Sequence, residues 1–205
     1  MRKGSEFDER ARAWDDAGRI ERARQVADVI AAAIPWLSRA RVLEYGAGTG
    51  LLGFALRDRA AHVTLADSSC EMLAVAREKI RGAGVANLTA LSLDLTADPP
   101  PAICFDVVCS LLTLHHIPDV SGLLRTFHGM ILPKGVLCIA DLDAEDGSFH
   151  GAVANVHRGF ERSALRGLVE AAGFADVRFQ MACEIEKPPS SGRRYSVFLA
   201  TARRP

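Results

Sequence analysis

Short apolar segments alternate with longer amphipathic ones from residue 41 onward. The apolar segments that we predict as strands are 41–46, 62–67, 88–95, 105–110 and 136–143. Between them, 49–60, 68–84 and 120–132 show helical periodicity. Strands buried on both faces, each followed by a helix, are typical of a parallel sheet covered by helices on both sides. The sequence therefore predicts a doubly wound α/β fold.

The segments on either side of this repeat predict a cap and a hairpin. Residues 8–34 read as one or two helices, which we expect to cross or flank the carboxyl edge of the sheet. Ligands bind at that edge in open α/β sheets, so Trp14 belongs either to a lid or to ordinary core packing. After a helix at 161–174, strands at 175–182 and 195–202 are expected to pair at one edge. We expect one domain over 1–205, with the cap at 8–34 and the α/β core at 41–205.

Composition narrows the class of partner. Lysine plus arginine and aspartate plus glutamate both number 25, and this zero net charge argues against a nucleic-acid partner. No apolar run reaches the roughly 18 residues of a membrane span. The five cysteines show no CxxC pair and suggest reduced thiols, so we expect a cytoplasmic protein. The oligomeric state stays open.

The segment "VLEYGAGTGLLGFAL", residues 42–56, fits two nucleotide-binding patterns. One is an acid followed by alternating glycines, from Glu44 to Gly50. The other is Gly-x-Gly-x-x-Gly, ending at Gly53, which indicates a dinucleotide. In both cases a loop from a strand to a helix presents unpaired backbone N–H groups and the positive end of the helix dipole.

Acidic residues at the ends of three successive strands help to choose between these ligands. Asp67 can accept hydrogen bonds from a ribose in either ligand. Glu44 would repel a pyrophosphate, but it would stabilise the ammonium and sulfonium of S-adenosylmethionine. Asp94 ends the third strand, within reach of an adenine amino group. These acids favour the cationic adenosyl ligand.

Several segments also resemble one family. "VLEYGAGTG", "LAD" (65–67), "LDL" (93–95), "FDVVCSLLTLHHIPD" (105–119) and "LPKGVLCIAD" (132–141) resemble the motifs of class I S-adenosylmethionine-dependent methyltransferases. Within these, the chain is most similar to the small-molecule branch of the ubiquinone/menaquinone-biosynthesis type. The resemblance implies a Rossmann-like sheet of seven strands in the order 3-2-1-4-5-7-6, with the last strand antiparallel. It also implies S-adenosyl-L-methionine as cofactor and S-adenosyl-L-homocysteine as product.

The same resemblance implies which residues surround the cofactor. Glu44 would anchor the methionine portion, and the loop that contacts it would be formed by Gly46, Ala47, Gly48 and Gly50. The adenosine and the sulfonium would lie beside a further set: Asp67, Ser68, Met72, Asp94, Leu95, Ser110 and Leu111.

The acceptor side is expected beyond the fourth and fifth strands. His115 and His116 are candidate general bases, because histidine titrates near neutrality. The leader and residues 142–160 are expected to line a pocket for a small-molecule acceptor, with candidate contacts from Trp14, His116, Asp143, His150 and Phe160. An oxygen-rich metal site is not expected, because Ser110-Leu111-Leu112 stands where such a site needs an acid after the fourth strand.

Two alternatives remain open. A short-chain NAD(P)-dependent oxidoreductase would need a Tyr-x-x-x-Lys pair, but Tyr45 and Tyr195 are followed four residues on by Thr49 and Leu199. A domain that binds S-adenosylmethionine or its demethylated product without catalysis is harder to exclude, because the binding motifs are stronger than the catalytic ones. The acceptor atom is not encoded in any motif of the sequence.

Overall fold

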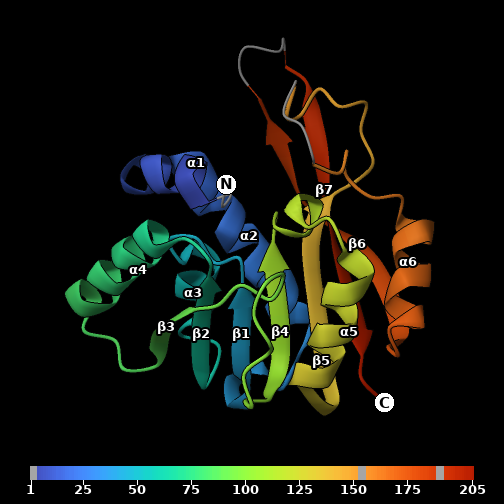
Figure 1. The fold of residues 1–205 in the computed structure, drawn as a ribbon, viewed down its shortest axis with the longest axis horizontal. Coiled ribbons are helices and arrows are strands. Elements are labelled where there is room, and N and C mark those ends of the chain that lie inside the picture. Colours follow the sequence, from blue (N-terminus) through green and yellow to red (C-terminus); the bar gives the residue numbers. More distant parts are fainter. Residues whose placement is uncertain (1–3, 152–155, 188–191) are drawn as a thin grey trace.

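The computed structural model describes residues 4–151, 156–187 and 192–205. Its centre is a seven-stranded sheet in the order β3-β2-β1-β4-β5-β7-β6 (Figure 1). The first five strands are parallel, and β7 runs antiparallel to both of its neighbours. Both the predicted order and the antiparallel last strand are therefore confirmed. The strands are β1 (Arg41–Tyr45), β2 (His62–Asp67), β3 (Leu88–Ser92), β4 (Phe105–Leu111), β5 (Ile131–Leu142), β6 (Ala175–Glu186) and β7 (Arg194–Arg203).

Helices cover both faces of this sheet because its central strands are apolar on both sides. Val42 and Leu43 are adjacent in β1 and pack into different clusters, as the alternation of side chains along a strand requires. One cluster includes residues of α2 (Ala17–Ala33) and α3 (Leu51–Leu56). The other includes α5 (Val120–Met130) and α6 (Arg162–Ala171). The carboxyl edge is left for a ligand.

The helix α4 (Cys70–Ala83) follows β2 and has a distinct capping residue at each end. The Ser69 hydroxyl accepts a hydrogen bond from the backbone N–H of Met72, which caps the first turn. Glu71 lies in that turn, and Gly84 ends the helix in a left-handed conformation. This cap also fixes the backbone directly after Asp67.

The leader forms α1 (Gly4–Arg10), the 3₁₀ turn η1 (Ala11–Ala13) and α2. In Figure 1, α1 lies above α4, at the end of the molecule where β6 and β7 rise past the other strands. The long α2 packs beside α3 and reaches β6 and β7. The leader therefore both crosses the carboxyl edge and flanks the sheet.

Three strand boundaries differ from the prediction by three residues or more. The third strand ends at Ser92, because the chain turns at 94–98, where Ala97 and Asp98 donate their N–H groups to the Asp94 carbonyl. The fifth strand begins at Ile131, through an irregular register in which Lys134 has a positive φ. The sixth strand continues to Glu186. None of these shifts moves a carboxyl end that carries Glu44 or Asp67. Among the described residues, no helix combines the length and apolar character needed to cross a membrane.

Candidate cofactor and acceptor site

The glycine loop leaves β1 in a conformation that favours glycine. Gly46 and Gly48 have φ values of 71° and 55°, in the left-handed region. A Cβ on Gly46 would overlap the Thr113 side chain, so the loop lies directly against the segment after β4. The Ala47 N–H donates to the Ala66 carbonyl at 3.0 Å and ties the loop to β2. The loop is thus held between two strand ends.

Asp67 organises this loop from the end of β2. Its carboxylate accepts the Gly48 N–H at 2.6 Å and the Ser69 N–H at 2.8 Å. Burial raises the pKa of Asp67, and the hydrogen bonds from Ser69 and Gly48 oppose that rise. An ionised carboxylate has about four lone-pair positions, so two remain for ligand hydroxyls. Ser68 is exposed beside it.

Glu44 lies beneath the loop and is 3% exposed. Its carboxylate accepts the Gly53 N–H at 2.8 Å, in the first turns of α3. Burial raises the pKa of Glu44 to about 8, and the Gly53 hydrogen bond partly offsets this. Without a cation nearby the protonated form is therefore favoured at neutral pH, whereas a bound cation would draw the group toward its charged form.

Replacing Glu44 with glutamine is expected to remove a pH-dependent loss of stability. A folded-state pKa of about 8 against an ordinary 4.5 means that the folded protein holds this proton more tightly. Stability from this group is therefore complete below about pH 4.5 and is lost as pH rises toward 8. The total is on the order of 5 kcal/mol. Denaturant unfolding of wild type and Glu44→Gln at pH 5 and pH 8 measures it.

The same comparison with exposed Glu71→Gln provides the control. If the stability difference between wild type and Glu44→Gln stays constant across this pH range, burial does not perturb Glu44 in the way described.

The third predicted acid is engaged in its own turn. The Asp94 carboxylate accepts the Thr96 N–H at 3.0 Å and also binds the Thr96 hydroxyl. The next residue, Leu95, donates its N–H to the buried Tyr45 hydroxyl at 3.2 Å. Asp94 thus caps a turn near the site, and its place beside an adenine stays a prediction.

Several observations fit an adenosyl ligand above the loop. The Ser110 hydroxyl, at the end of β4 beside half-buried Leu111, is buried with no hydrogen-bond partner. A Cβ placed on Gly48 would meet only ordinary contacts, at 3.7 Å from Trp14 Nε1 and 3.8 Å from Met72 Sδ. Trp14 and Met72 therefore pack over the bare backbone of Gly48. The residues present therefore fit the cofactor that the sequence predicts.

The leader is fastened to this space by polar contacts. The Thr49 hydroxyl donates to Asp15, and Lys79 joins Asp15 at 2.6 Å and the Thr49 carbonyl at 2.9 Å. The Ser69 hydroxyl donates to Asp8. Half-buried Trp14 therefore lies over Gly48 of the glycine loop, and its part in a lid stays a prediction.

The acceptor side begins at η3 (Leu114–His116), just after β4. His115 is 2% exposed, and its Nδ1 lies 2.6 Å from a carboxylate oxygen of Asp141, which is 0% exposed. The same carboxylate accepts the Leu142 N–H at 2.8 Å. Because the carboxylate only accepts, Nδ1 carries the proton and Nε2 is left as an acceptor.

Two further imidazoles surround His115. The ring centroids of His116 and His150 lie 4.1 and 4.8 Å from that of His115. Burial, followed by the neighbouring His115, lowers the pKa of His150 to about 4. The Phe7 ring contacts His116 edge-on, so the leader reaches this cluster as well.

The remaining predicted acceptor residues have structural partners. Asp143 forms a two-point ion pair with Arg162 at 2.6 and 2.7 Å. Phe160 is 9% exposed and bridges to Asp143 through the backbone. Phe149 is buried against His150 and Tyr195. These residues shape the loop after β5, and direct contact with an acceptor stays a prediction.

Sequence reasoning missed some residues that organise the site. Asp141, near the carboxyl end of β5, is not predicted from the sequence as the partner of His115. The rule that selected Glu44 and Asp67, an acid at the carboxyl end of a parallel strand, also applies to it. No sequence signal links Asp15 to Lys79, because the two lie far apart in the chain.

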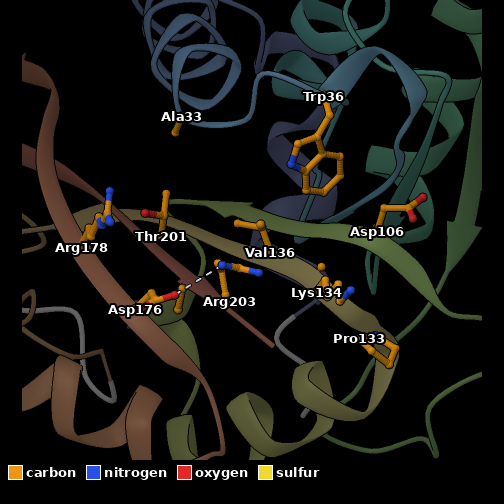
Figure 2. Close-up of a pocket in the computed structure, with 12 residues that line it drawn as sticks. Ala33, Trp36, Asp106, Pro133, Lys134, Val136, Asp176, Arg178, Thr201 and Arg203 are labelled. Carbon is orange, nitrogen blue, oxygen red and sulfur yellow. Dashed lines mark ion pairs between the residues drawn. The ribbon is translucent and has the colours of Figure 1, made fainter. Parts of the chain in front are cut away.

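A separate cavity of about 540 Å³ lies at the opposite end of the sheet. Figure 2 shows Arg178, Arg203, Asp176 and Lys134 around it, with Arg203 paired to Asp176 at 3.6 Å. None of the predicted site residues lines it. It therefore has no part in the site at the carboxyl edge.

Comparisons with known proteins find similarity to methyltransferases. Residues 42–135 match a family model described as a methyltransferase domain. A ubiquinone biosynthesis O-methyltransferase from Xylella fastidiosa is 33% identical over 129 residues, which are 62% of this chain and 51% of that protein. The chain thus spans about half the length of the curated relatives it matches.

Solved structures share the fold over more of the chain. One is a chain in the complex between the Haloferax volcanii Trm112 methyltransferase activator and a candidate methyltransferase. Its TM-score is 0.78 at 21% identity, covering 98% of both chains. Another is the N-methyltransferase NodS from Bradyrhizobium japonicum with S-adenosylhomocysteine, with a TM-score of 0.70 at 16% identity, covering 93% of this chain and 90% of that one. The family model and the curated relatives thus show that a large part of this chain is similar to methyltransferase domains, and the solved structures show that it shares their fold.

Proposed function

We propose that this chain transfers a methyl group from S-adenosylmethionine to a small-molecule acceptor, and that the acceptor atom is an ionisable hydroxyl oxygen. The observation that carries the methyl-donor part is the convergence of Glu44 and Asp67 on the glycine loop. The hydroxyl is supported by the buried His115–Asp141 pair and by relatives named as O-methyltransferases. Zero net charge argues against a nucleic-acid acceptor.

When bound, S-adenosylmethionine supplies a methyl group that its sulfonium already activates. Asp67 would accept hydrogen bonds from the ribose hydroxyls through its remaining lone pairs. Glu44, in its ionised form, would stabilise the positive charge of the methionine portion. Ser110 would offer its unpartnered hydroxyl, while Met72 and Trp14 would pack over the ligand.

The acceptor would lie between the leader and η3. Trp14 and Phe7 exclude water from this side, which strengthens the electrostatic interactions inside. His115 Nε2 would take the proton of the acceptor hydroxyl as its oxygen attacks the methyl group. Asp141 holds the imidazole in the required tautomer and stabilises the resulting imidazolium. Alignment of the reacting atoms supplies much of the remaining rate.

Calorimetric titration with S-adenosylhomocysteine and with NADH tests the cofactor. We expect one equivalent of S-adenosylhomocysteine to bind and NADH not to bind. The reverse result would favour the alternative function, an NAD(P)-dependent oxidoreductase. Turnover is then measured with a panel of phenols, quinols, amines and thiols, of which the phenols and quinols are expected to react.

His115→Gln tests the base. It is expected to lower kcat by roughly 100-fold or more while the affinity for S-adenosylhomocysteine stays unchanged. Binding without turnover across the whole panel would instead support a non-catalytic binding domain.

A further inference from the structure

Three imidazoles meet at one point beside the candidate acceptor site. His115 and His116 come from η3, and His150 comes from the loop after β5. One ring nitrogen from each lies within 4.8 Å of the other two. We propose that His115, His116 and His150 form a binding site for a late first-row divalent metal, for which Zn²⁺ is the natural probe.

The separations are close to what such a metal needs. Zinc–nitrogen bonds of about 2.0–2.1 Å in a tetrahedral site place ligand nitrogens roughly 3.3 Å apart. Metal binding would therefore draw the three imidazole nitrogens together from separations of up to 4.8 Å, a shift of about 1.5 Å. Imidazole donors suit zinc, copper, nickel and cobalt rather than magnesium or calcium. This donor set differs from the oxygen-rich site that the sequence argued against.

Two polar features around the cluster point to a ligand. The Nε2 atom of His150 is buried and has no hydrogen-bond partner among the residues that the structure describes, an arrangement that costs free energy unless something binds there. Asp141 fixes His115 through Nδ1, so that the Nε2 atom of His115 carries the lone pair that a metal would bind. A carboxylate behind a ligating histidine is the usual support for such a site, since it sets the tautomer and raises ligand basicity.

A metal here would change how the acceptor is activated. It would occupy His115 Nε2, the atom that takes the proton in the metal-free protein. Three protein ligands leave a fourth position open, where an acceptor hydroxyl or a water could bind and lose its proton more readily. The metal site itself does not depend on methyl transfer, because its test needs neither cofactor nor acceptor.

The test is direct metal binding by the full chain after chelator treatment. Equilibrium dialysis with Zn²⁺ and elemental analysis give the stoichiometry, and Co²⁺ absorption reports the ligand geometry. We expect one tightly bound equivalent in wild type and in the control His62→Gln, whose histidine starts β2 at the opposite edge. His150→Ala and His115→Ala are each expected to weaken binding at least 100-fold, and Asp141→Asn 10- to 100-fold.

Circular dichroism and thermal unfolding verify that each variant folds. His150→Ala is the decisive variant, because its ring accepts no hydrogen bond at Nε2 that the fold would lose. If wild type binds no equivalent of Zn²⁺ or Co²⁺, or if His150→Ala binds as tightly as wild type, the site does not exist. Titration of the same samples with S-adenosylhomocysteine separates this failure from a failure of the proposed function.

Discussion

Asp67→Ala is expected to weaken binding of S-adenosylhomocysteine by roughly 100-fold. The side chain stands at the end of β2, and its carboxylate already holds the Gly48 and Ser69 N–H groups. Two hydrogen bonds from ribose hydroxyls to a charged acceptor contribute about 1.5–3 kcal/mol each. Losing about 3 kcal/mol in total corresponds to that rise in Kd. Isothermal titration calorimetry measures the effect.

Matched variants separate ligand contact from loop collapse. Asp67→Asn keeps the shape and one acceptor oxygen, so a smaller loss, about 10-fold, is expected. Exposed Asp58→Ala changes the net charge equally but lies away from the loop, and its affinity should match wild type. If Asp67→Ala binds the ligand as tightly as wild type, the nucleotide does not bind at this strand end.

The alternation of strands and helices was predictable because each strand carries its own signal, whereas the order of the strands was implied by the family resemblance. Five apolar segments separated by amphipathic ones leave few arrangements for a parallel sheet. The loop after β1 was equally predictable. Glycines between a strand and a helix are typical of a tight loop that binds a nucleotide. Ser69 and Gly84 marked the ends of α4 through local chemistry alone.

The strand ends were less predictable, because tertiary contacts decide them. "LSLDL" alternates like a strand through residue 95, yet Asp94 turns back onto Thr96 and ends the pairing at Ser92. The "PKG" segment reads as a turn, but it continues β5 with one positive φ at Lys134. Local propensity favoured both readings, and sheet pairing overrode them.

The acceptor side was the least predictable part of the candidate site. His150 lies 35 residues after His115 in sequence, at no spacing typical of a metal site. It reaches the cluster because the loop after β5 folds back along η3, where the His157 N–H donates to the His115 carbonyl at 2.8 Å. A contact between residues so far apart in the chain produces no periodic pattern in a single sequence. Asp143, a candidate acceptor contact, pairs with Arg162 at the start of α6.

One principle nevertheless connects both halves of the site. Glu44, Asp67 and Asp141 are acids at or near the carboxyl ends of parallel strands, and each carboxylate accepts a hydrogen bond from a loop or helix at this edge of the sheet. A buried acid that must be satisfied fixes the geometry of the loop around it. The same residues that shape the site therefore also stabilise the fold. Replacing one of them is expected to reduce both ligand binding and the free energy of unfolding.

Asp141→Ala is expected to lower the free energy of unfolding by about 3–5 kcal/mol. The carboxylate is 0% exposed and accepts from His115 Nδ1, from the Leu142 N–H and, at 3.3 Å, from the His115 N–H. Truncation leaves these donors buried without a partner, and each then costs its desolvation free energy. Denaturant unfolding measures the loss.

The size of this effect distinguishes a buried network from an ordinary surface acid. Asp146 lies in the same region and pairs with Arg193 at 2.8 Å, but it is exposed, so Asp146→Ala should change stability little. Asp141→Asn keeps an acceptor oxygen and should lie between wild type and Asp141→Ala. A loss below about 1 kcal/mol for Asp141→Ala would mean that water replaces the carboxylate. Asp141 would then not fix the tautomer of His115. That result would contradict both proposed roles of His115, as general base and as metal ligand.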